Sequence, residues 1–211
     1  MTKTRVLIID DQLMARQLFE LYLSSGENYE VVGTLASAAF AETFIRHTPV
    51  DLIIMDILMN DGSNGLDAAE KIKQLRPDIK IVAVTSMVEA SWMKRAEKIG
   101  IESFWYKEAA QETILDVLDR TVAGESVYPD TPPRVPLGLA ESEDFTEREL
   151  EVLRLMTTGM SNTQIAGKLD ITQNTVKTHI QHMLDKTGFD NRTELAIEAR
   201  VKGIVVNIDK E

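Results

Sequence analysis

Cysteine is absent from this 211-residue chain, so neither a disulfide nor a thiolate metal site can form. The sequence also has no apolar run approaching the ~18 residues that a membrane-spanning helix needs. Its N-terminus lacks the apolar core of a signal peptide. These absences make a cytoplasmic protein without a membrane partner the expected class.

Positive charge is scarce, because 23 Lys and Arg residues face 34 Asp and Glu residues, for a net charge of −11. This shortage argues against a general nucleic-acid binder, since cationic side chains supply most of the non-specific affinity for phosphates. The acidity is unevenly placed. Residues 1–144 carry a net charge of −10, whereas residues 145–211 hold nine basic and ten acidic side chains. Nearly all the acidity therefore belongs to the first part of the chain.

The first 123 residues alternate strand-like and helix-like segments. Strands are expected at 5–9, 30–34, 51–55, 79–84 and 102–106. Helices are expected near 12–24, 37–47, 65–75, 90–98 and 109–123. This alternation predicts an α/β domain with a doubly wound parallel sheet and helices on both of its faces.

Proline is concentrated in one stretch, residues 124–144, which holds four of the six prolines and an acidic cluster. Proline at that density disfavours helix and predicts a semi-extended spacer. We therefore expect residues 124–144 to form a Pro-rich acidic linker between the domain 1–123 and a second domain, 145–211.

Residues 145–211 read as four short helices. Thr146 and Ser161 each begin a capping-box sequence, with Glu or Gln three residues later. Thr172 can cap a third helix, and Asn191 opens a fourth. The second domain is therefore expected to be a small all-α bundle of four helices.

Carboxylates close two of the predicted strands. The apolar run 50–55 ends in Asp56, and the run 6–9 ends in Asp10 and Asp11. Parallel strands bring their carboxyl ends to one edge, where open α/β sheets place their ligand sites. Three acids at one edge would repel one another unless a cation lies among them. The sequence thus predicts a Mg²⁺ site, with Asp11 and Asp56 as direct ligands and Asp10 acting through water.

Three further residues fit the same edge. The backbone carbonyl of Leu58 can complete the metal's protein ligands, Thr85 follows the strand 79–84 with a hydroxyl, and Lys107 follows the last strand with an ammonium. Metal and ammonium would neutralise phosphoryl oxygens while Asp56 serves as the acceptor nucleophile. An isolated Asp-Asp pair is more often an ordinary strand end or helix cap. Five side chains in order on four strand ends favour a phosphoryl-transfer site: Asp10, Asp11, Asp56, Thr85 and Lys107.

Residues 1–123 resemble the receiver domain of bacterial two-component response regulators. The matching residues are Asp10-Asp11, Asp56 within the segment 54–59, Thr85-Ser86 and Lys107. The resemblance implies a flavodoxin-like five-stranded sheet that takes a phosphoryl group onto Asp56 from the phosphohistidine of a sensor histidine kinase. It also implies that Thr85 swings toward the phosphate while Phe104 rotates inward, which rearranges the face formed by the fourth helix, fifth strand and fifth helix.

The chain departs from the receiver pattern directly after the acceptor. Family members usually carry Met-Pro and then Asp-Gly, whereas residues 59–65 read Met-Asn-Asp-Gly-Ser-Asn-Gly, without proline and one residue longer. By family analogy, the residues two beyond Asp56 and Thr85 tune the lifetime of the phosphoryl group. Here they are Leu58 and Met87, both apolar and unable to position an attacking water, so we expect slow self-hydrolysis.

Residues 161–187 read as a helix, a short turn and a second helix, the spacing of a helix-turn-helix whose second helix enters the major groove. The second helix has an apolar stripe expected to face the core: Val176, Ile180, Met183 and Leu184. The candidate contacts to bases and phosphates are polar: Lys168, Thr172, Gln173, Asn174, Lys177, Thr178, Gln181 and Lys186. Because few of these side chains are cationic, an ordinary solvated helix face is the alternative interpretation.

The segments 145–153, 159–166 and 175–180 resemble the LuxR/FixJ (NarL) type of output domain, across all four helices. The resemblance implies base contacts near Lys177, Thr178 and Gln181. A dimer would double the phosphate contacts and match an inverted-repeat site, so DNA affinity should depend on dimerisation. Candidate dimer contacts are Leu18, Tyr22, Val117 and Val122 in the first domain, although core packing is the expected role of most of these four. The other candidate is the last helix, with Ala196, Ile197, Ala199, Arg200 and Val201.

These features predict a response regulator and transcription factor rather than an enzyme, in which phosphorylation of Asp56 promotes dimerisation and DNA binding. The partners implied are a sensor histidine kinase, double-stranded DNA, a second copy of the chain and RNA polymerase. One alternative is an atypical receiver-type transcription factor that is dimeric without phosphorylation. Another is a Mg²⁺-dependent phosphohydrolase, which would need a general acid near Asp56, and no Asp stands two residues beyond it.

Overall fold

The computed structural model describes residues 3–107 and 113–205. The chain divides into two compact units, one of Met1–Ser86 with Ser91–Thr131 and one of Met87–Ala90 with Pro132–Glu211. Within the described ranges, no helix combines the length and the apolar character that crossing a membrane requires. Each unit has its own architecture and is considered by itself.

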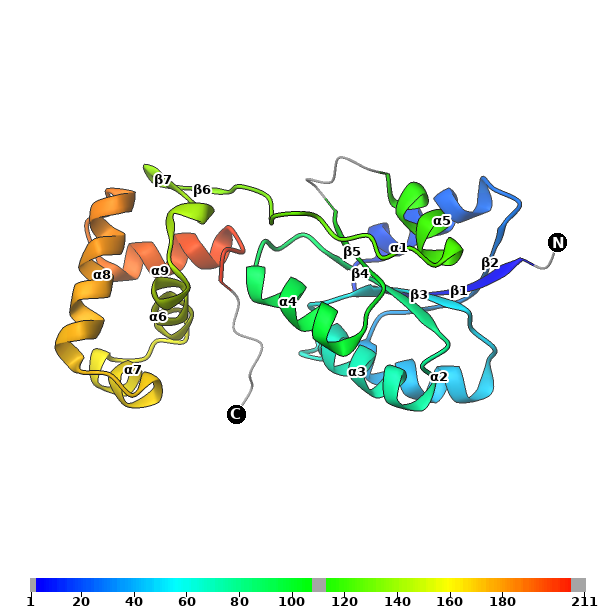
Figure 1. Ribbon diagram of the computed structural model, residues 1–211, viewed down its shortest axis with the longest axis horizontal. Coiled ribbons are helices and arrows are strands. Elements are labelled where there is room, and N and C mark those ends of the chain that lie inside the picture. The colour runs from blue at the N-terminus through cyan, green and yellow to red at the C-terminus, as the bar shows by residue number, and fades with distance from the viewer. Residues whose placement is uncertain (1–2, 108–112, 206–211) are drawn as a thin grey trace. The chain divides into compact units, whose positions relative to one another are not determined.

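The first unit is built on a five-stranded sheet in the order β2-β1-β3-β4-β5, with every neighbouring pair parallel. The strands are β1 Thr4–Ile9, β2 Tyr29–Leu35, β3 Leu52–Asp56, β4 Lys80–Thr85 and β5 Ser103–Tyr106. The helices are α1 Leu13–Ser24, η1 Ala38–Phe40, α2 Ala41–His47, α3 Gly65–Leu75, α4 Ala90–Ile99 and α5 Ile114–Ala123. In Figure 1, α1 and α5 cover one face of the sheet and α2, α3 and α4 the other. The prediction of a flavodoxin-like doubly wound sheet is confirmed.

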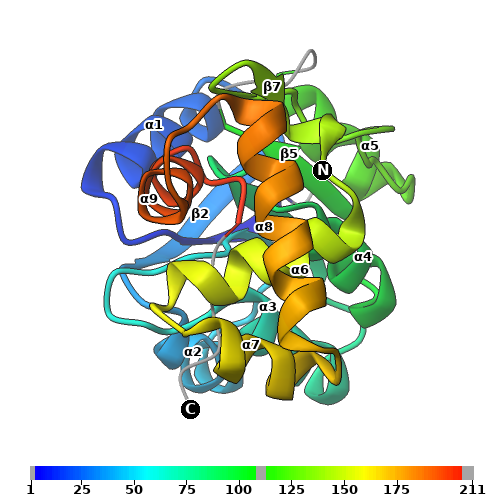
Figure 2. The same cartoon turned by 90° about the vertical axis from the view of Figure 1, so that its left-hand side faces the viewer.

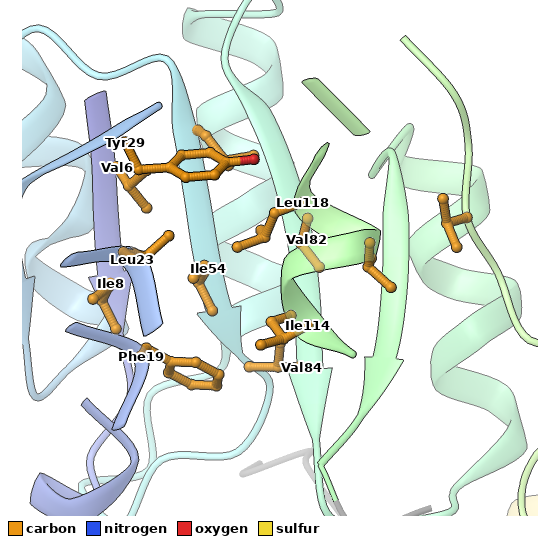
Figure 3. Packing of buried hydrophobic residues seen from close by; sticks show 13 residues of the cluster. Val6, Ile8, Phe19, Leu23, Tyr29, Ile54, Val82, Val84, Ile114 and Leu118 are labelled. Atoms are coloured by element: carbon orange, nitrogen blue, oxygen red, sulfur yellow. The ribbon is translucent and has the colours of Figure 1, made fainter. Parts of the chain in front are cut away.

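An apolar core joins the sheet to α1 and α5, as Figure 3 shows. Ile8, Ile54 and Val82 come from the three central strands, and all are fully buried. Against them pack Phe19 of α1 and Leu118 of α5, which are 3% and 1% exposed. Truncating one such side chain to Ala costs about 2–5 kcal/mol of stability, because transfer and cavity terms add. This packing holds α1 and α5 against the central strands.

Strand register brings three chain segments to one edge of the sheet. Ile9, the last residue of β1, lies opposite Met55, so Asp10 follows at the level of Asp56. Asp56 in turn lies opposite Val84, one residue before the end of β4. Because the strands are parallel, all of these positions fall at the carboxyl edge, where ligand sites of such sheets form.

The open edge of β5 is covered by the chain just after α5. Val127 forms a parallel bridge with Ser103, and the Phe104 N–H donates to the Val127 carbonyl at 2.9 Å. Ser103 Oγ accepts from the Val127 N–H at 3.1 Å. An unpaired strand edge offers a row of N–H and C=O groups, and a semi-extended segment is well suited to pair with them.

The expected linker, residues 124–144, is therefore divided between the two units in the structure. Residues up to Thr131 belong to the first unit and residues from Pro132 to the second. In the second unit, β6 Pro136–Leu137 and β7 Ala140–Glu141 form a short antiparallel hairpin, followed by the short 3-10 helix η2 Ser142–Asp144. The prolines at 129–136 disfavour α-helix but leave the extended backbone free to pair, and composition alone does not reveal the pairing.

In the part of the second unit that the structure describes after Asp144, the helices are α6 Glu147–Thr157, α7 Asn162–Leu169, α8 Gln173–Thr187 and α9 Arg192–Val201. Each begins at the N-cap residue that the sequence indicates: Thr146, Ser161, Thr172 and Asn191. The first two form complete capping boxes, which satisfy backbone N–H groups that no helical partner reaches. Figure 2 shows α8, in orange, in front of α6 and α7. The all-α prediction for this region is confirmed.

Candidate functional site

Three carboxylates meet at the carboxyl edge of the sheet. Asp10, Asp11 and Asp56 each present an oxygen, and these oxygens lie within 4.8 Å of one another. Asp10 and Asp56 are 0% and 4% exposed, while Asp11 is half-buried. Burial raises the pKa of Asp56 to about 7; the nearby Lys107 opposes this rise, and the charge of Asp10 adds to it. Oxygen-only donors crowded in this way suit a hard divalent cation.

Lys107 is the positive charge of this acidic pocket. Its Nζ lies 2.6 Å from Asp10 Oδ2 and 3.2 Å from Asp56 Oδ2. The side chain is only 12% exposed, and its backbone N–H donates to the carbonyl of Thr85 at 2.8 Å. Thr85 itself is buried at the end of β4. The ends of β1, β3, β4 and β5 thus bring together the residues that the sequence pattern selects.

Each carboxylate of the pocket accepts a hydrogen bond from a backbone N–H, two of them from the residues that directly follow the same strand. The Gln12 N–H donates to Asp10 Oδ1 at 2.9 Å, and the Ile57 N–H donates to Asp56 Oδ1 at 2.9 Å. The third bond runs between loops, from the Asn60 N–H to Asp11 Oδ2 at 2.6 Å. Groups of this kind orient metal ligands and tune their affinity. The hydrogen bond between Asn60 and Asp11 could not be predicted from the sequence, because the two residues lie 49 positions apart.

The loop after Asp56 contains a tight turn. The Gly62 N–H donates to the Met59 carbonyl at 3.0 Å, and Gly62 has a φ of 80°, a conformation that glycine adopts without strain. Asn64 then caps α3 by accepting from the Leu66 N–H at 2.8 Å. A Cβ at Gly65 would overlap the Asp56 carbonyl oxygen, so only glycine fits there. The turn, the cap of α3 and the close approach of Gly65 together fix the backbone that follows Asp56.

Leu58 and Phe104, the remaining predicted residues of the first domain, lie beside the pocket and in the core. Leu58 pairs with Asn64 in an isolated antiparallel bridge beside the pocket, and its carbonyl stays a predicted metal ligand. Phe104 is 1% exposed, and its ring centroid lies 5.2 Å from that of Tyr106. The inward rotation of Phe104 on phosphorylation stays a prediction.

A second candidate site is the exposed face of α8. The predicted apolar stripe faces the core, since Val176, Ile180 and Met183 are buried and Leu184 is half-buried. Seven of the eight candidate DNA-binding residues are exposed: Lys168, Thr172, Gln173, Asn174, Lys177, Thr178 and Gln181. Between α7 and α8, Asp170 adopts a left-handed conformation (φ 52°). Arg148 of α6 holds the end of α7 by donating to the Leu169 carbonyl at 2.9 Å.

Lys186, the eighth candidate, makes its contacts within the second unit. Its Nζ lies 2.7 Å from Glu149 Oε2 and 2.9 Å from the Asp144 carbonyl, and it stands 5.7 Å from the centre of the Phe145 ring. Glu149 is almost fully buried and needs a cation, because a buried charge without a partner is costly. Lys186 therefore stabilises the fold of this unit, and the proposed DNA-binding face omits it.

Comparison with known proteins finds a match for each unit. Residues 6–119 match the family model of the response regulator receiver domain, and residues 143–199 match that of bacterial regulatory proteins, luxR family. Among curated proteins, the response regulator protein VraR of Staphylococcus epidermidis is 38% identical over 200 residues. That alignment covers 92% of this chain and 95% of the relative. The VraR protein of Staphylococcus aureus is 36% identical over the same length and coverage.

Solved structures with the same two-part architecture are also found. The chain is similar to RcsB in a structure of two RcsB dimers bound to two parallel DNAs, with a TM-score of 0.64, 21% identity, and coverage of 94% of this chain and 98% of that one. It is similar to RcsB of Salmonella enterica serovar Typhimurium bound to promoter rprA with the phosphomimetic BeF3-, with a TM-score of 0.63 and 21% identity. That match covers 96% of this chain and 100% of the other. At such identity the likeness supports the fold.

Proposed function

The chain belongs to the DNA-binding response regulators of the LuxR family, and we propose that phosphorylation of Asp56 by a sensor histidine kinase controls its binding to DNA. The observation that carries the proposal is the acidic pocket. Asp10, Asp11 and Asp56 converge within 4.8 Å, and Lys107 Nζ reaches two of them. A pocket of this composition is suited to accept a phosphoryl group and to neutralise its oxygens.

Each pocket residue has a separate part in the proposed transfer. A carboxylate oxygen of Asp56 forms the new bond to phosphorus while the bond from phosphorus to the kinase histidine breaks, and the imidazole nitrogen leaves. Asp11, Asp56 and the Leu58 carbonyl would hold Mg²⁺ directly, with Asp10 acting through water. When bound, Mg²⁺ neutralises charge on the transferred group. Lys107, with its ammonium 3.2 Å from Asp56, would turn from that carboxylate to a phosphoryl oxygen.

Sequence-specific DNA binding is assigned to the exposed face of α8. Gln173, Asn174, Lys177, Thr178 and Gln181 offer amide, hydroxyl and ammonium groups of the kinds that read base edges and phosphates. The N-terminus of α8 adds N–H groups that suit a phosphate. The RcsB structures in complex with DNA support this assignment through their shared fold.

Phosphorylation is proposed to act by promoting a homodimer on an inverted-repeat site. The second domain is nearly neutral, so a single copy should bind DNA weakly. Leu18 and Tyr22 of α1 are 44% and 38% exposed, and Ile197 and Val201 of α9 are 56% and 73% exposed, so both helices offer apolar surface. Val117 is buried and is not part of such a surface. RNA polymerase is a further proposed partner at regulated promoters.

The test is the solution mass of the full chain by light scattering, with and without Mg²⁺ and beryllium fluoride. A monomer that becomes a dimer only when Asp56 is intact would support phosphorylation-gated assembly. The variant Asp56→Asn should stay monomeric, whereas Asp130→Asn, which changes an exposed carboxylate outside the pocket, should behave as the wild type. Equal masses in all conditions, together with DNA binding that ignores the phosphoryl mimic, would contradict the proposal.

A further inference from the structure

A hydrogen-bonded cluster joins two loops beside the acidic pocket. Asp61 Oδ2 accepts from Ser37 Oγ at 2.5 Å, and Asp61 Oδ1 accepts from Ser63 Oγ at 2.7 Å and from the Ser63 N–H at 2.8 Å. The Ala38 N–H donates to Ser63 Oγ at 3.2 Å. We call Ser37, Asp61 and Ser63 the serine–aspartate latch. It ties the segment after β2 to the lengthened loop after β3.

A further hydrogen bond to Ser37 and the negative charge of Asp61 stabilise the serine–aspartate latch. Ser37 is 7% exposed, and its Oγ also accepts from the Ala39 N–H at 3.2 Å, which caps the short helix η1. Hydrogen bonds from Ser37 and then from Ser63 lower the pKa of Asp61 to about 2. Asp61 is therefore ionised at neutral pH, and bonds to an ionised acceptor are stronger than those between neutral groups.

The segment held by the latch is the one that reaches the pocket. Asn60 directly precedes Asp61, and its N–H donates to Asp11 Oδ2 at 2.6 Å. The turn from Met59 to Gly62 contains both residues, so the position of Asp61 sets the position of the Asn60 N–H. With Oδ2 occupied by this N–H, the Asp11 carboxylate is held in one orientation and Oδ1 is left for a cation.

We propose that the serine–aspartate latch is a positioning device for the divalent cation: it fixes the lengthened loop so that the Asn60 N–H orients Asp11 as a metal ligand. This inference rests on the proposed function, because it assumes that the acidic pocket binds a cation. Loss of groups that orient metal ligands typically weakens metal affinity about 10–100-fold. Opening the latch should therefore weaken Mg²⁺ binding about tenfold while the fold is retained.

The main test is calorimetric titration of the full chain with Mg²⁺, comparing Ser37→Ala with the wild type. Ser37→Ala removes the bond from Ser37 Oγ to Asp61 and leaves in place the pair Asp61–Ser63 and the weaker bond from the Ala38 N–H to Ser63 Oγ. Asp61→Asn provides a second variant at an exposed position, where a failure to fold is not expected. Ser25→Ala is the matched control, because it deletes an exposed hydroxyl that donates to the carbonyl of Leu21 at the end of α1, away from both loops.

The expected result is about tenfold weaker Mg²⁺ binding in Ser37→Ala and Asp61→Asn, wild-type affinity in Ser25→Ala, and recovery in Ser37→Thr, which restores the hydroxyl. Phosphorylation by acetyl phosphate should need more Mg²⁺ for half-saturation and reach the wild-type rate at saturating Mg²⁺. A merely structural role would change thermal unfolding and leave the Mg²⁺ affinity unaltered. That outcome in both latch variants would overturn the proposal for the latch alone. A wild type without Mg²⁺ binding would overturn the proposed function together with it.

Discussion

The ring of Phe104 lies 6.1 Å, between centroids, from the ring of Tyr128, which belongs to the segment that covers the edge of β5. The Tyr128 hydroxyl donates to the Ile101 carbonyl at 2.8 Å. The backbone of Phe104 is bonded to Val127, one residue before Tyr128. The residue expected to move on phosphorylation is thus in direct contact with the chain that leads toward the DNA-binding domain.

Tyr128→Phe should lower the free energy of unfolding of the receiver domain by about 1 kcal/mol, because one half-buried hydrogen bond is lost. Tyr128→Ala should cost more, since the ring packed on Phe104 is lost as well. Urea unfolding followed by tryptophan fluorescence measures both changes. Tyr22→Phe, which alters a hydroxyl on the exposed side of α1, is the control and should leave the unfolding free energy unchanged.

Lys107→Met should strengthen Mg²⁺ binding about tenfold. The Lys107 ammonium now neutralises Asp10 and Asp56, so Mg²⁺ has to compete with it for these carboxylates. Phosphorylation of the same variant should be slower, because the variant lacks the ammonium that would neutralise the phosphoryl oxygens together with Mg²⁺. Calorimetry with Mg²⁺ and the rate of phosphorylation by acetyl phosphate are the two measurements. Weaker Mg²⁺ binding in this variant would show that Lys107 supports the metal rather than competing with it.

Lys177→Ala should weaken specific DNA binding by about 1–3 kcal/mol if Lys177 contacts a base, with an unchanged salt dependence. If it contacts a phosphate instead, the variant should reduce the slope of log affinity against log salt by about 1. Fluorescence anisotropy at several salt concentrations separates the two cases. An affinity equal to that of the wild type would indicate that the α8 face is simply solvated.

Lys186→Met should act on stability rather than on DNA recognition, because Lys186 Nζ is bonded to Glu149 and to the Asp144 carbonyl. Leaving the buried Glu149 without its cation should cost about 2 kcal/mol of unfolding free energy. Chemical denaturation of the full chain reports this loss. An altered base preference in the folded variant would return Lys186 to the DNA-binding face.

Acid should remove part of the stability that Glu149 provides. Burial alone would raise the pKa of Glu149, but hydrogen bonds from Lys186 and Thr146 outweigh it and hold the pKa below its usual value of 4.5. Since the folded-state pKa is the lower one, this contribution is present above pH 4.5 and is lost as the pH falls through the folded value. Glu149→Gln keeps the capping box but not the charge. Its stability should thus fall less than that of the wild type on acidification, as measured by thermal unfolding across the same pH range.

The sequence by itself determined the features that depend on neighbouring residues. Buried strands are recognisable from unbroken apolar runs such as the one before Asp56, and helix starts from caps such as Thr146 and Asn191. Because parallel strands share a carboxyl edge, the meeting of Asp10, Asp11 and Asp56 could be predicted from the same local patterns.

Only the tertiary structure decided which distant groups complete these elements. The bond from Asn60 to Asp11 spans 49 residues, and that from Lys186 to Glu149 spans 37. The pairing of Val127 with the edge of β5 likewise joins chain segments whose composition alone indicates only an extended spacer. Hydrophobic periodicity and capping preferences act over a few residues. The partner of a side chain across the fold depends instead on where packing places both chain segments, and no local pattern carries that information.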